Sequence, residues 1–413
     1  MGVLSWRTLL QTRRANGSIF GLALCAVPLS IAVTEILLAL ALVIRITVLA
    51  HVRAKASTPR VFWFWLAWVS LELVSWLRSS DIPAGWGEIR HLLLLGAVFL
   101  LLPALDHARD RVVVWRGIFA TATLNSIVIV WQVVSRVHYY RIHPSVSVDA
   151  IVYLRTGGLL HHWMIYGTVE VLVFAGLLEF WQLYPEERRW SLPFLIVNCL
   201  AICLSLTRML WVCCWVLLAV ELIWRRSKLG LALPFVPVVL FVVSPGFVRS
   251  RVTMSLSPSY YSNAERLQML RVGWRMVVDK PLTGIGPGRV DKVYRQYLEG
   301  TEPVPAYHGH LHNNLVQLAA EFGLPVAVAA ILFVTLLFRD LREQCRFAVG
   351  RDRRFLCRTS ILALAGFLLA GMFDYTYGHS LGLILVSFVV LSPLVPSDPG
   401  YNPNKVICRK RTA

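Results

Sequence analysis

Three histidines near the end of a long polar interval are the residues of this chain best suited to proton transfer. His308, His310 and His312 occupy alternate positions within residues 262–323, the longest polar stretch of a largely apolar sequence. A histidine has an ordinary pKa of about 6.5, so its neutral ring can accept a proton from an attacking hydroxyl. His312 stands where the next apolar run begins, and the positive end of a helix there favours a neutral ring and attracts anions. We therefore predict that His312 is a general base.

Three arginines indicate which substrate would lie beside this base. Arg208 stands at a short polar break between two apolar runs, Arg266 lies in the long polar interval, and Arg155 precedes another apolar run. A guanidinium group is permanently charged and forms paired hydrogen bonds with phosphate oxygens. A pyrophosphate leaving group needs charge stabilisation more than protonation. We therefore predict that the three arginines bind a lipid-linked pyrophosphate.

The histidines also permit a second interpretation, a metal site. Alternate residues of an extended chain point the same way, and imidazole is a good zinc ligand, so His308, His310 and His312 would be the ligands. The interpretation that we favour has no metal and no other cofactor. If His312 is not the base, the next candidates are carboxylates, namely Glu265, Asp291 and Asp374.

Composition decides the class of protein. The chain has 413 residues, of which 57% are hydrophobic, and its mean hydropathy is positive. Several runs of nearly 20 apolar residues predict an all-α polytopic membrane protein rather than a soluble domain. The formal charge of +18 is spread between the apolar runs. It therefore indicates orientation in the membrane and contact with membrane lipids, and no nucleic acid is expected as a partner.

We expect about twelve membrane-spanning helices and one large loop outside the cytoplasm. The first apolar stretch, residues 18–50, is interrupted at Pro28 and is expected to cross twice. The other expected spans are 61–77, 89–105, 112–135, 162–183, 190–206, 208–224, 230–248, 314–338, 355–373 and 379–395. The chain then divides into residues 1–248 with nine spans, the loop 249–313, residues 314–395 with three spans and a basic tail at 396–413.

The distribution of arginine and lysine predicts the orientation of these spans. Positively charged loops stay on the cytoplasmic side. The densest basic connection lies between Arg339 and Arg358, and the C-terminal residues Lys405 to Arg411 are also basic. Both termini are therefore expected in the cytoplasm, which places the loop 249–313 on the opposite side.

The loop is expected to contain short helices and a tight turn. Ser262 followed by Glu265 is a capping-box pattern, so a helix should begin near Asn263. Its apolar side, which would lie in the membrane interface, consists of Leu267, Leu270, Trp274, Val277 and Val278. The glycines of residues 284–288 predict a turn in which the backbone can approach a ligand closely. A second short helix is expected over residues 289–298.

These motifs resemble the bacterial O-antigen ligases and the related O-antigen polymerases and O-linked oligosaccharyltransferases. His312-Asn313, followed by nine residues and Gly323, is similar to the signature that closes the periplasmic loop of that family. Further segments resemble its arginine and glycine motifs, namely Arg266–Leu270, Pro281–Gly288, Ser205–Arg208 and, as a weaker match, Arg155–Gly158. The resemblance covers residues 150–325, and the sequence departs from the family pattern at Pro325-Val326.

The resemblance implies a glycosyltransferase with a GT-C-like fold in the bacterial inner membrane, with its active site facing the periplasm. It would transfer O-antigen polysaccharide from undecaprenyl pyrophosphate to a sugar of the lipid A core oligosaccharide, by metal-independent inverting transfer. His312 would be catalytic, and Arg208, Arg266 and Arg155 would bind the donor pyrophosphate. The residues expected to support these groups or to bind the acceptor are His308, His310, Asn313, Arg289 and Asp374.

Three alternatives remain at this point. An O-antigen polymerase or a protein O-oligosaccharyltransferase would use the same kind of donor and the same site. A secondary transporter would also have about twelve spans with both ends in the cytoplasm, but transporters usually contain paired repeats, and here the large loop occurs once.

Overall fold

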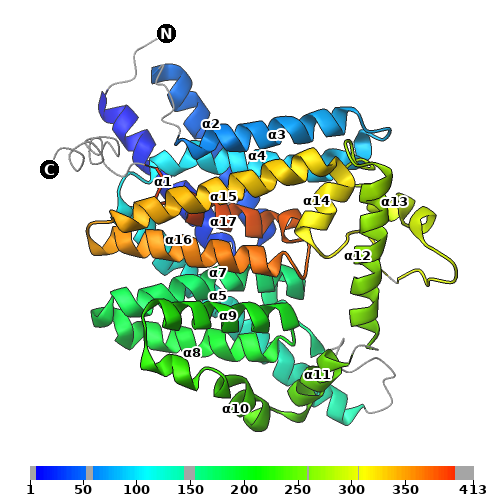
Figure 1. The fold of residues 1–413 in the computed structure, drawn as a ribbon. Coiled ribbons are helices and arrows are strands. Elements are labelled where there is room, and N and C mark those ends of the chain that lie inside the picture. The colour runs from blue at the N-terminus through cyan, green and yellow to red at the C-terminus, as the bar shows by residue number, and fades with distance from the viewer. Residues whose placement is uncertain (1–5, 53–58, 144–153, 258–259, 306, 396–413) are drawn as a thin grey trace.

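The computed structural model describes residues 6–52, 59–143, 154–257, 260–305 and 307–395, and in these residues every regular element is a helix (Figure 1). The helices of the main bundle are α1 (Trp6–Ala26), α2 (Ile31–Val52), α3 (Val61–Leu77), α4 (Trp86–Leu101), α5 (Ala108–Ile142), α7 (Trp163–Leu183), α8 (Arg188–Leu204), α9 (Arg208–Trp224), α15 (Leu324–Arg346), α16 (Arg351–Ala370) and α17 (Ser380–Leu391). Helices between α9 and α15 are α10 (Phe235–Val243), α11 (Gly246–Leu256), α12 (Tyr261–Asp279), α13 (Val290–Val293) and α14 (Asn314–Phe322).

Short 3-10 helices connect several of these elements. They are η1 (Pro83–Gly85), η2 (Leu102–Ala104), η3 (Gly158–Leu160), η4 (Pro185–Glu187), η5 (Lys228–Ala232), η6 (Tyr294–Tyr297) and η7 (Thr376–Gly378).

Length and apolar composition confirm an all-α polytopic membrane protein. Five helical segments of the described residues are long and apolar enough to cross a membrane, namely Ile31–Ala50, Pro83–Ala104, Ala108–Ile142, Trp163–Leu183 and Leu324–Arg346. Shorter apolar helices, such as α3 and α17, accompany them. The total of twelve spans stays a prediction, and the expected basic tail at 396–413 lies outside the described residues.

The core of the bundle forms where α7, α16 and α17 meet α5. Every residue of α17 from Ser380 to Leu391 is buried, because this helix is apolar on all sides and is surrounded by other helices. Aromatic rings fill the contact between α5, α7 and α16, where the Phe355 ring lies 5.7 Å from Phe180 and 5.9 Å from Trp115. This packing joins α5, α7 and α16 at the end of the bundle opposite the loop that follows α16.

Two of the expected spans are broken in the structure. The span predicted over residues 230–248 consists of η5 and the nine-residue α10, and α11 follows after Pro245. A helix of nine residues extends only about 14 Å, so α10 alone is too short to cross a bilayer. The span predicted over 314–338 is divided at Gly323 into α14 and α15. Pro325 stands in the first turn of α15, where a proline needs no hydrogen-bond partner.

The loop helix α12 runs across the ends of the bundle helices (Figure 1), and its start differs from the prediction. It begins at Tyr261 without a side-chain cap, so the predicted capping box is wrong. Its buried face is formed by Met269, Val272 and Met276, which pack against residues of α14. Most of the predicted apolar stripe, including Trp274, is exposed on the outer side, and its place in the membrane interface stays a prediction.

The glycine turn approaches the protein's own backbone, which corrects the expectation that it approaches a ligand. Gly284 has a φ of 66°, and a Cβ there would lie 2.3 Å from the backbone of Glu321 at the end of α14. Backbone hydrogen bonds from Ile285 to Ala320 and from Leu324 to Pro281, both 2.8 Å, join the turn to the junction of α14 and α15. These bonds satisfy groups that a broken helix leaves without partners.

Candidate functional site

His312 lies directly before α14 and is held there by the cap of that helix. The side chain of Asn313 accepts hydrogen bonds from the backbone N–H groups of Leu315 and Val316, each 3.1 Å, as an N-cap residue does. The backbone N–H of Leu311 donates to the side chain of Gln317 at 2.7 Å. His312 itself has a φ of 51°, which is unusual for a residue with a side chain and marks a sharp change of chain direction. Asn313 thus orients the end of the loop.

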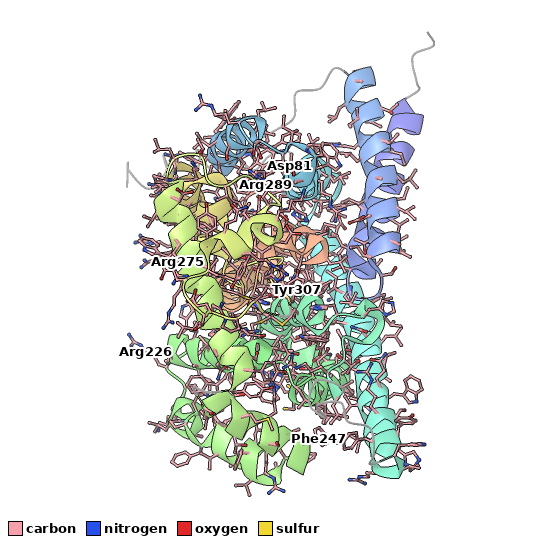
Figure 2. The ribbon with its side chains drawn as sticks, turned by 90° about the vertical axis from the view of Figure 1, so that its right-hand side faces the viewer. Asp81, Arg226, Phe247, Arg275, Arg289 and Tyr307 are labelled. Carbon is pink, nitrogen blue, oxygen red and sulfur yellow. The ribbon has the colours of Figure 1, made fainter. Side chains whose placement is uncertain are left out.

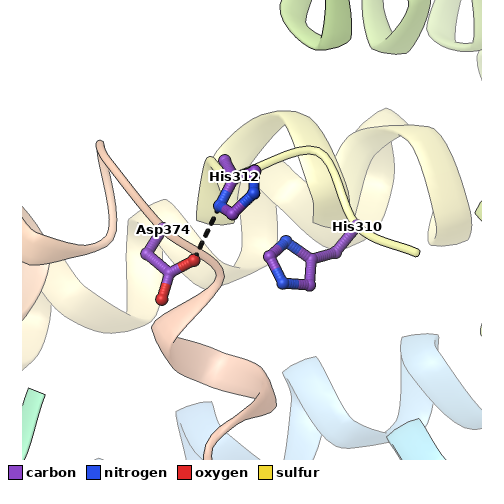
Figure 3. Close-up of side chains that lie close together, drawn as sticks. All are labelled: His310, His312 and Asp374. Carbon is purple, nitrogen blue, oxygen red and sulfur yellow. Dashed lines mark hydrogen bonds and ion pairs between the residues drawn. The ribbon is translucent and has the colours of Figure 1, made fainter. Parts of the chain in front are cut away.

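Asp374 contacts His312 from the loop between α16 and α17. The Nδ1 atom of His312 lies 2.8 Å from an Oδ of Asp374, whose side chain is 1% exposed (Figure 3). Burial on its own raises the pKa of the Asp374 carboxyl. The hydrogen bond with His312 and the nearby rings of His379 and His310 outweigh burial, so the pKa ends below its ordinary value. The carboxylate is therefore ionised at neutral pH and fixes the orientation of the His312 ring.

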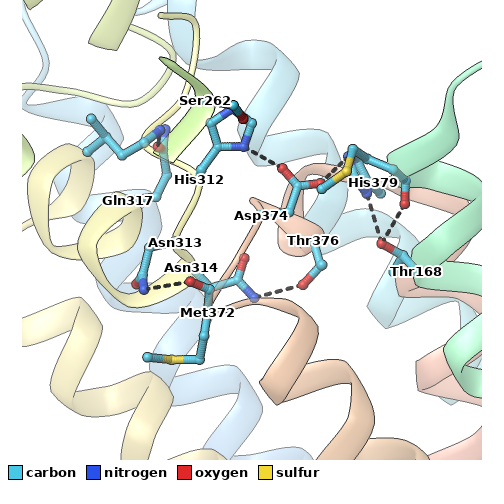
Figure 4. Close-up of polar contacts among 12 residues, drawn as sticks. Thr168, Ser262, His312, Asn313, Asn314, Gln317, Met372, Asp374, Thr376 and His379 are labelled. Atoms are coloured by element: carbon cyan, nitrogen blue, oxygen red, sulfur yellow. Dashed lines mark hydrogen bonds and ion pairs between the residues drawn. The ribbon is translucent and has the colours of Figure 1, made fainter. Parts of the chain in front are cut away.

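A second histidine supports the same carboxylate from the opposite side. The Nε2 atom of His379 lies 3.7 Å from the other oxygen of Asp374. The Nδ1 atom of His379 lies 3.3 Å from the hydroxyl of Thr168 in α7 (Figure 4). Asn314 also holds the Asp374 loop, because its side chain donates to the hydroxyl of Thr376 at 2.8 Å. The loop is thus attached to both α7 and α14.

Of the three histidines of the motif, His310 and His312 lie next to each other, and His308 packs elsewhere. His308 packs on the Tyr294 ring at 5.2 Å, and its Nδ1 lies 3.1 Å from the carbonyl oxygen of Pro305. The His310 ring lies 4.3 Å from the His312 ring. Burial, and then the charge of His312, lower the pKa of His310 to about 4, so His310 is neutral at neutral pH.

The structure therefore changes the set of residues that could bind a metal ion. His310, His312 and Asp374 offer one atom each, and these atoms lie within 4.8 Å of one another. Imidazole and carboxylate are suitable zinc ligands, so the three groups fit a cation in type. His308 does not belong to this set, which corrects the predicted trio of histidines.

Arg208 and Arg266 lie on the side of the site formed by α9 and the first turns of α12. Arg208, the first residue of α9, donates hydrogen bonds to the side chains of Asn263 and Ser262, the latter at 3.1 Å. This contact explains why Ser262 does not cap α12. Burial lowers the pKa of Arg266, whereas the charge of Asp374 opposes that effect. Arg266 is therefore close enough to Asp374 for their opposite charges to attract each other.

Two further arginines complete this cluster, one of which sequence reasoning missed. Arg155 stacks on the Trp163 ring at 5.3 Å, and burial, followed by the charge of Arg251, lowers the pKa of Arg155 to about 10. Two buried nitrogens of Arg155 have no hydrogen-bond partner among the described residues. Arg251 in α11 is 3% exposed and donates to the carbonyl of Leu206 at 3.3 Å and to the hydroxyl of Tyr260 at 3.0 Å. No sequence motif contained it.

Arg289 lies away from this cluster. Its guanidinium donates to the Ser80 hydroxyl at 2.6 Å and to the Ile285 carbonyl at 2.8 Å. Figure 2 shows Arg289 beside Asp81, at the end of the α3 and α4 pair and apart from Tyr307. It holds the glycine turn against the bundle and does not contact the His312 and Asp374 pair.

The arrangement combines two kinds of chemistry. A histidine whose Nδ1 is bonded to a buried carboxylate has its Nε2 free to accept a proton, as in other proton-transferring His and Asp pairs. Four guanidinium groups close enough to repel one another create a site that attracts an anion. The fold and the site together define a membrane protein that is equipped for group transfer from an anionic substrate.

Comparison with protein families identifies the group to which the site belongs. Residues 193–333 match the family model described as O-antigen ligase, and this segment contains Arg208, Arg266 and His312. This segment is therefore similar to the O-antigen ligase family, as the sequence motifs predicted. The match supports, in general terms, a membrane-bound enzyme of the O-antigen ligase or polymerase kind. No curated protein matched the chain.

Proposed function

We propose that this protein is an O-antigen ligase. It transfers O-antigen polysaccharide from undecaprenyl pyrophosphate to a sugar of the lipid A core at the periplasmic face of the inner membrane. The observation that carries the proposal is the hydrogen bond between His312 and the buried Asp374 beside four clustered arginines. His312, Arg208, Arg251 and Arg266 lie in the segment that matches the O-antigen ligase family. Both termini are cytoplasmic in this proposal, and the membrane helices form a GT-C-like scaffold.

In the proposed reaction, an acceptor hydroxyl attacks the anomeric carbon of the donor sugar. The Nε2 atom of His312 takes the hydroxyl proton, while Asp374 stabilises the imidazolium through the hydrogen bond at Nδ1. The bond from the anomeric carbon to the phosphate oxygen breaks as the new glycosidic bond forms, and the configuration at that carbon inverts. Undecaprenyl pyrophosphate leaves with the bonding electron pair, and Arg208, Arg266 and Arg155 stabilise its added negative charge.

The first test separates chemistry from donor binding. Purified His312→Ala and His312→Gln enzymes are expected to bind lipid-linked donor normally and to ligate about 10²- to 10⁴-fold more slowly, because a general base contributes that much to a rate. His308→Ala is the matched control, since His308 packs on Tyr294 away from the base. Ligation by His312→Ala at a near-normal rate would remove His312 as the base.

The second test distinguishes the proposed ligase from the other members of the family. A strain that lacks the protein is analysed by lipopolysaccharide gel and by extraction of lipid-linked glycan. Ligase function is supported if the long-chain ladder disappears while full-length O-antigen accumulates on undecaprenyl pyrophosphate. Failure to make long chains at all means a polymerase, and an intact ladder with unglycosylated protein means an oligosaccharyltransferase.

A further inference from the structure

Tyr307 and His310 form a small aromatic surface next to the proposed base. The Tyr307 ring lies 5.1 Å from the His310 ring and 6.4 Å from the His312 ring. Tyr307 is 57% exposed, although tyrosines that serve only packing are usually more covered. Figure 2 shows Tyr307 near the middle of the face that α12 crosses. The exposed ring therefore stands at the open side of the candidate site.

His310 has an unused hydrogen-bonding atom at the same place. Its Nδ1 atom is buried and has no hydrogen-bond partner among the described residues. A buried polar atom without a partner costs free energy, so such atoms in native proteins commonly mark a contact with a ligand or an ordered water. A ring nitrogen of histidine can donate or accept a hydrogen bond, so this atom can bond to a sugar hydroxyl.

The positions of Tyr307 and His310 relative to His312 indicate which of the two substrates they would contact. Asp374 occupies the Nδ1 side of His312, and Figure 3 shows His310 on the other side of that ring. The attacking hydroxyl must approach the free nitrogen of His312, so the sugar that carries it lies against His310. The donor pyrophosphate is expected at the arginines, among which Arg208 is held by Asn263 and Ser262 at the start of α12.

A glycine leaves room for the Tyr307 ring in its present position. Gly309 directly precedes His310, and a Cβ at Gly309 would lie 2.7 Å from the Tyr307 hydroxyl. A side chain there would push the tyrosine out of its present position. An aromatic ring offers an apolar face against which the C–H face of a sugar ring can pack, and a neutral imidazole offers a hydrogen-bonding atom beside it.

We propose that Tyr307 and His310 bind the acceptor sugar. The Tyr307 ring packs against the apolar face of a pyranose, and His310 hydrogen-bonds to a hydroxyl next to the one that attacks. This inference rests on the proposed function, because it assumes that His312 activates an acceptor hydroxyl. It assigns to the 307–310 segment a role in selecting the acceptor, separate from both proton transfer and pyrophosphate binding.

The test measures KM for each substrate with purified enzyme. Tyr307→Ala is expected to raise KM for the lipid A core acceptor about tenfold, the effect of losing one aromatic contact, with KM for the donor unchanged. Tyr307→Phe keeps the ring and should stay close to wild type. His310→Phe keeps a ring beside His312 and should also raise KM for the acceptor alone, since it lacks the nitrogen. Tyr139→Ala, which removes an exposed tyrosine at the end of α5, is the matched control.

The possible outcomes separate the two proposals. Unchanged KM for the acceptor in both Tyr307→Ala and His310→Phe overturns the acceptor subsite. A rise in KM for the donor overturns it as well, because the surface would then hold the donor sugar. An equal loss in Tyr307→Ala and Tyr307→Phe assigns the effect to the hydroxyl and refutes ring packing. Absence of ligation by the wild-type enzyme, with full activity as a polymerase, overturns the proposed function instead.

Discussion

The role of Asp374 can be tested by a substitution that keeps its shape and removes its charge. In Asp374→Asn, the amide still fits the buried site, but the negative partner of the His312 ring is lost. A hydrogen bond to a charged group contributes about 1.5–3 kcal/mol, and about 1.4 kcal/mol corresponds to a factor of ten in rate. The maximal rate of ligation is therefore expected to fall at least about ten- to hundredfold, because the imidazolium formed at His312 during the reaction is less stable.

The control and the refuting result follow from the same structure. Asp352→Asn changes a carboxylate at the other end of α16, where Asp352 accepts a hydrogen bond from Tyr184, and should leave the ligation rate unchanged. An Asp374→Asn enzyme with a normal ligation rate would refute this role of Asp374. The lowered pKa of Asp374 also predicts how the stability of the protein depends on pH. Because folding favours the ionised carboxylate, this group stabilises the protein at pH values above its pKa in the unfolded chain, which is about 3.9. The stability advantage of wild type over Asp374→Asn should therefore be present above about pH 4 and be lost progressively as the pH falls from there toward the lower pKa that Asp374 has in the folded protein.

Three further predictions concern binding, folding and metal. Arg266→Ala should abolish detectable donor binding and Arg266→Lys should restore it poorly, because lysine lacks the paired donors, whereas Arg271→Ala on the exposed side of α12 should bind donor normally. Gly284→Ala should destabilise the protein by at least about 1–2 kcal/mol, seen as a lower melting temperature than that of Gly246→Ala, since only Gly284 has a left-handed backbone and a backbone neighbour at its Cβ position. Ligation should continue at full rate in chelator, and stoichiometric zinc whose removal stops the reaction would replace the general-base mechanism at His312 by a metal mechanism.

Much of the fold was predictable because membrane helices have strong local signals. A run of about 20 apolar residues must form a helix, since the bilayer offers no partner for free backbone groups. The predicted span 208–224 has the same bounds as α9, and 61–77 has the same bounds as α3. The errors at 230–248 and 314–338 arose where apolar composition continues through a helix break. Pro245 and Gly323 mark those breaks, but hydropathy alone does not register them.

The loop was less predictable because its helix is positioned by tertiary contacts. The Ser262 and Glu265 pattern predicted a local cap, yet Ser262 accepts a hydrogen bond from Arg208, which is 54 residues away in sequence. The apolar stripe containing Trp274 was predicted for the membrane interface, whereas the methionine and valine side of α12 that packs against α14 was not predicted. Periodicity showed that a helix exists, whereas the choice of its buried face depends on the partner surface.

The arrangement of the site follows from topology once the helices are known. α15 has 23 residues and α16 has 20, so they extend about 35 Å and 30 Å and together return the chain to the end of the bundle at which it left. Asp374, which follows α16, must therefore emerge at the same end as the start of α15, close to where His312 precedes α14. Sequence reasoning could place the two residues on one side of the membrane. It could not predict their 2.8 Å contact, because that depends on Asn314 and His379, which attach the Asp374 loop to α14 and to α7. Arg251 shows the same limit, since its partners at Leu206 and Tyr260 belong to two other segments that only the folded chain brings together.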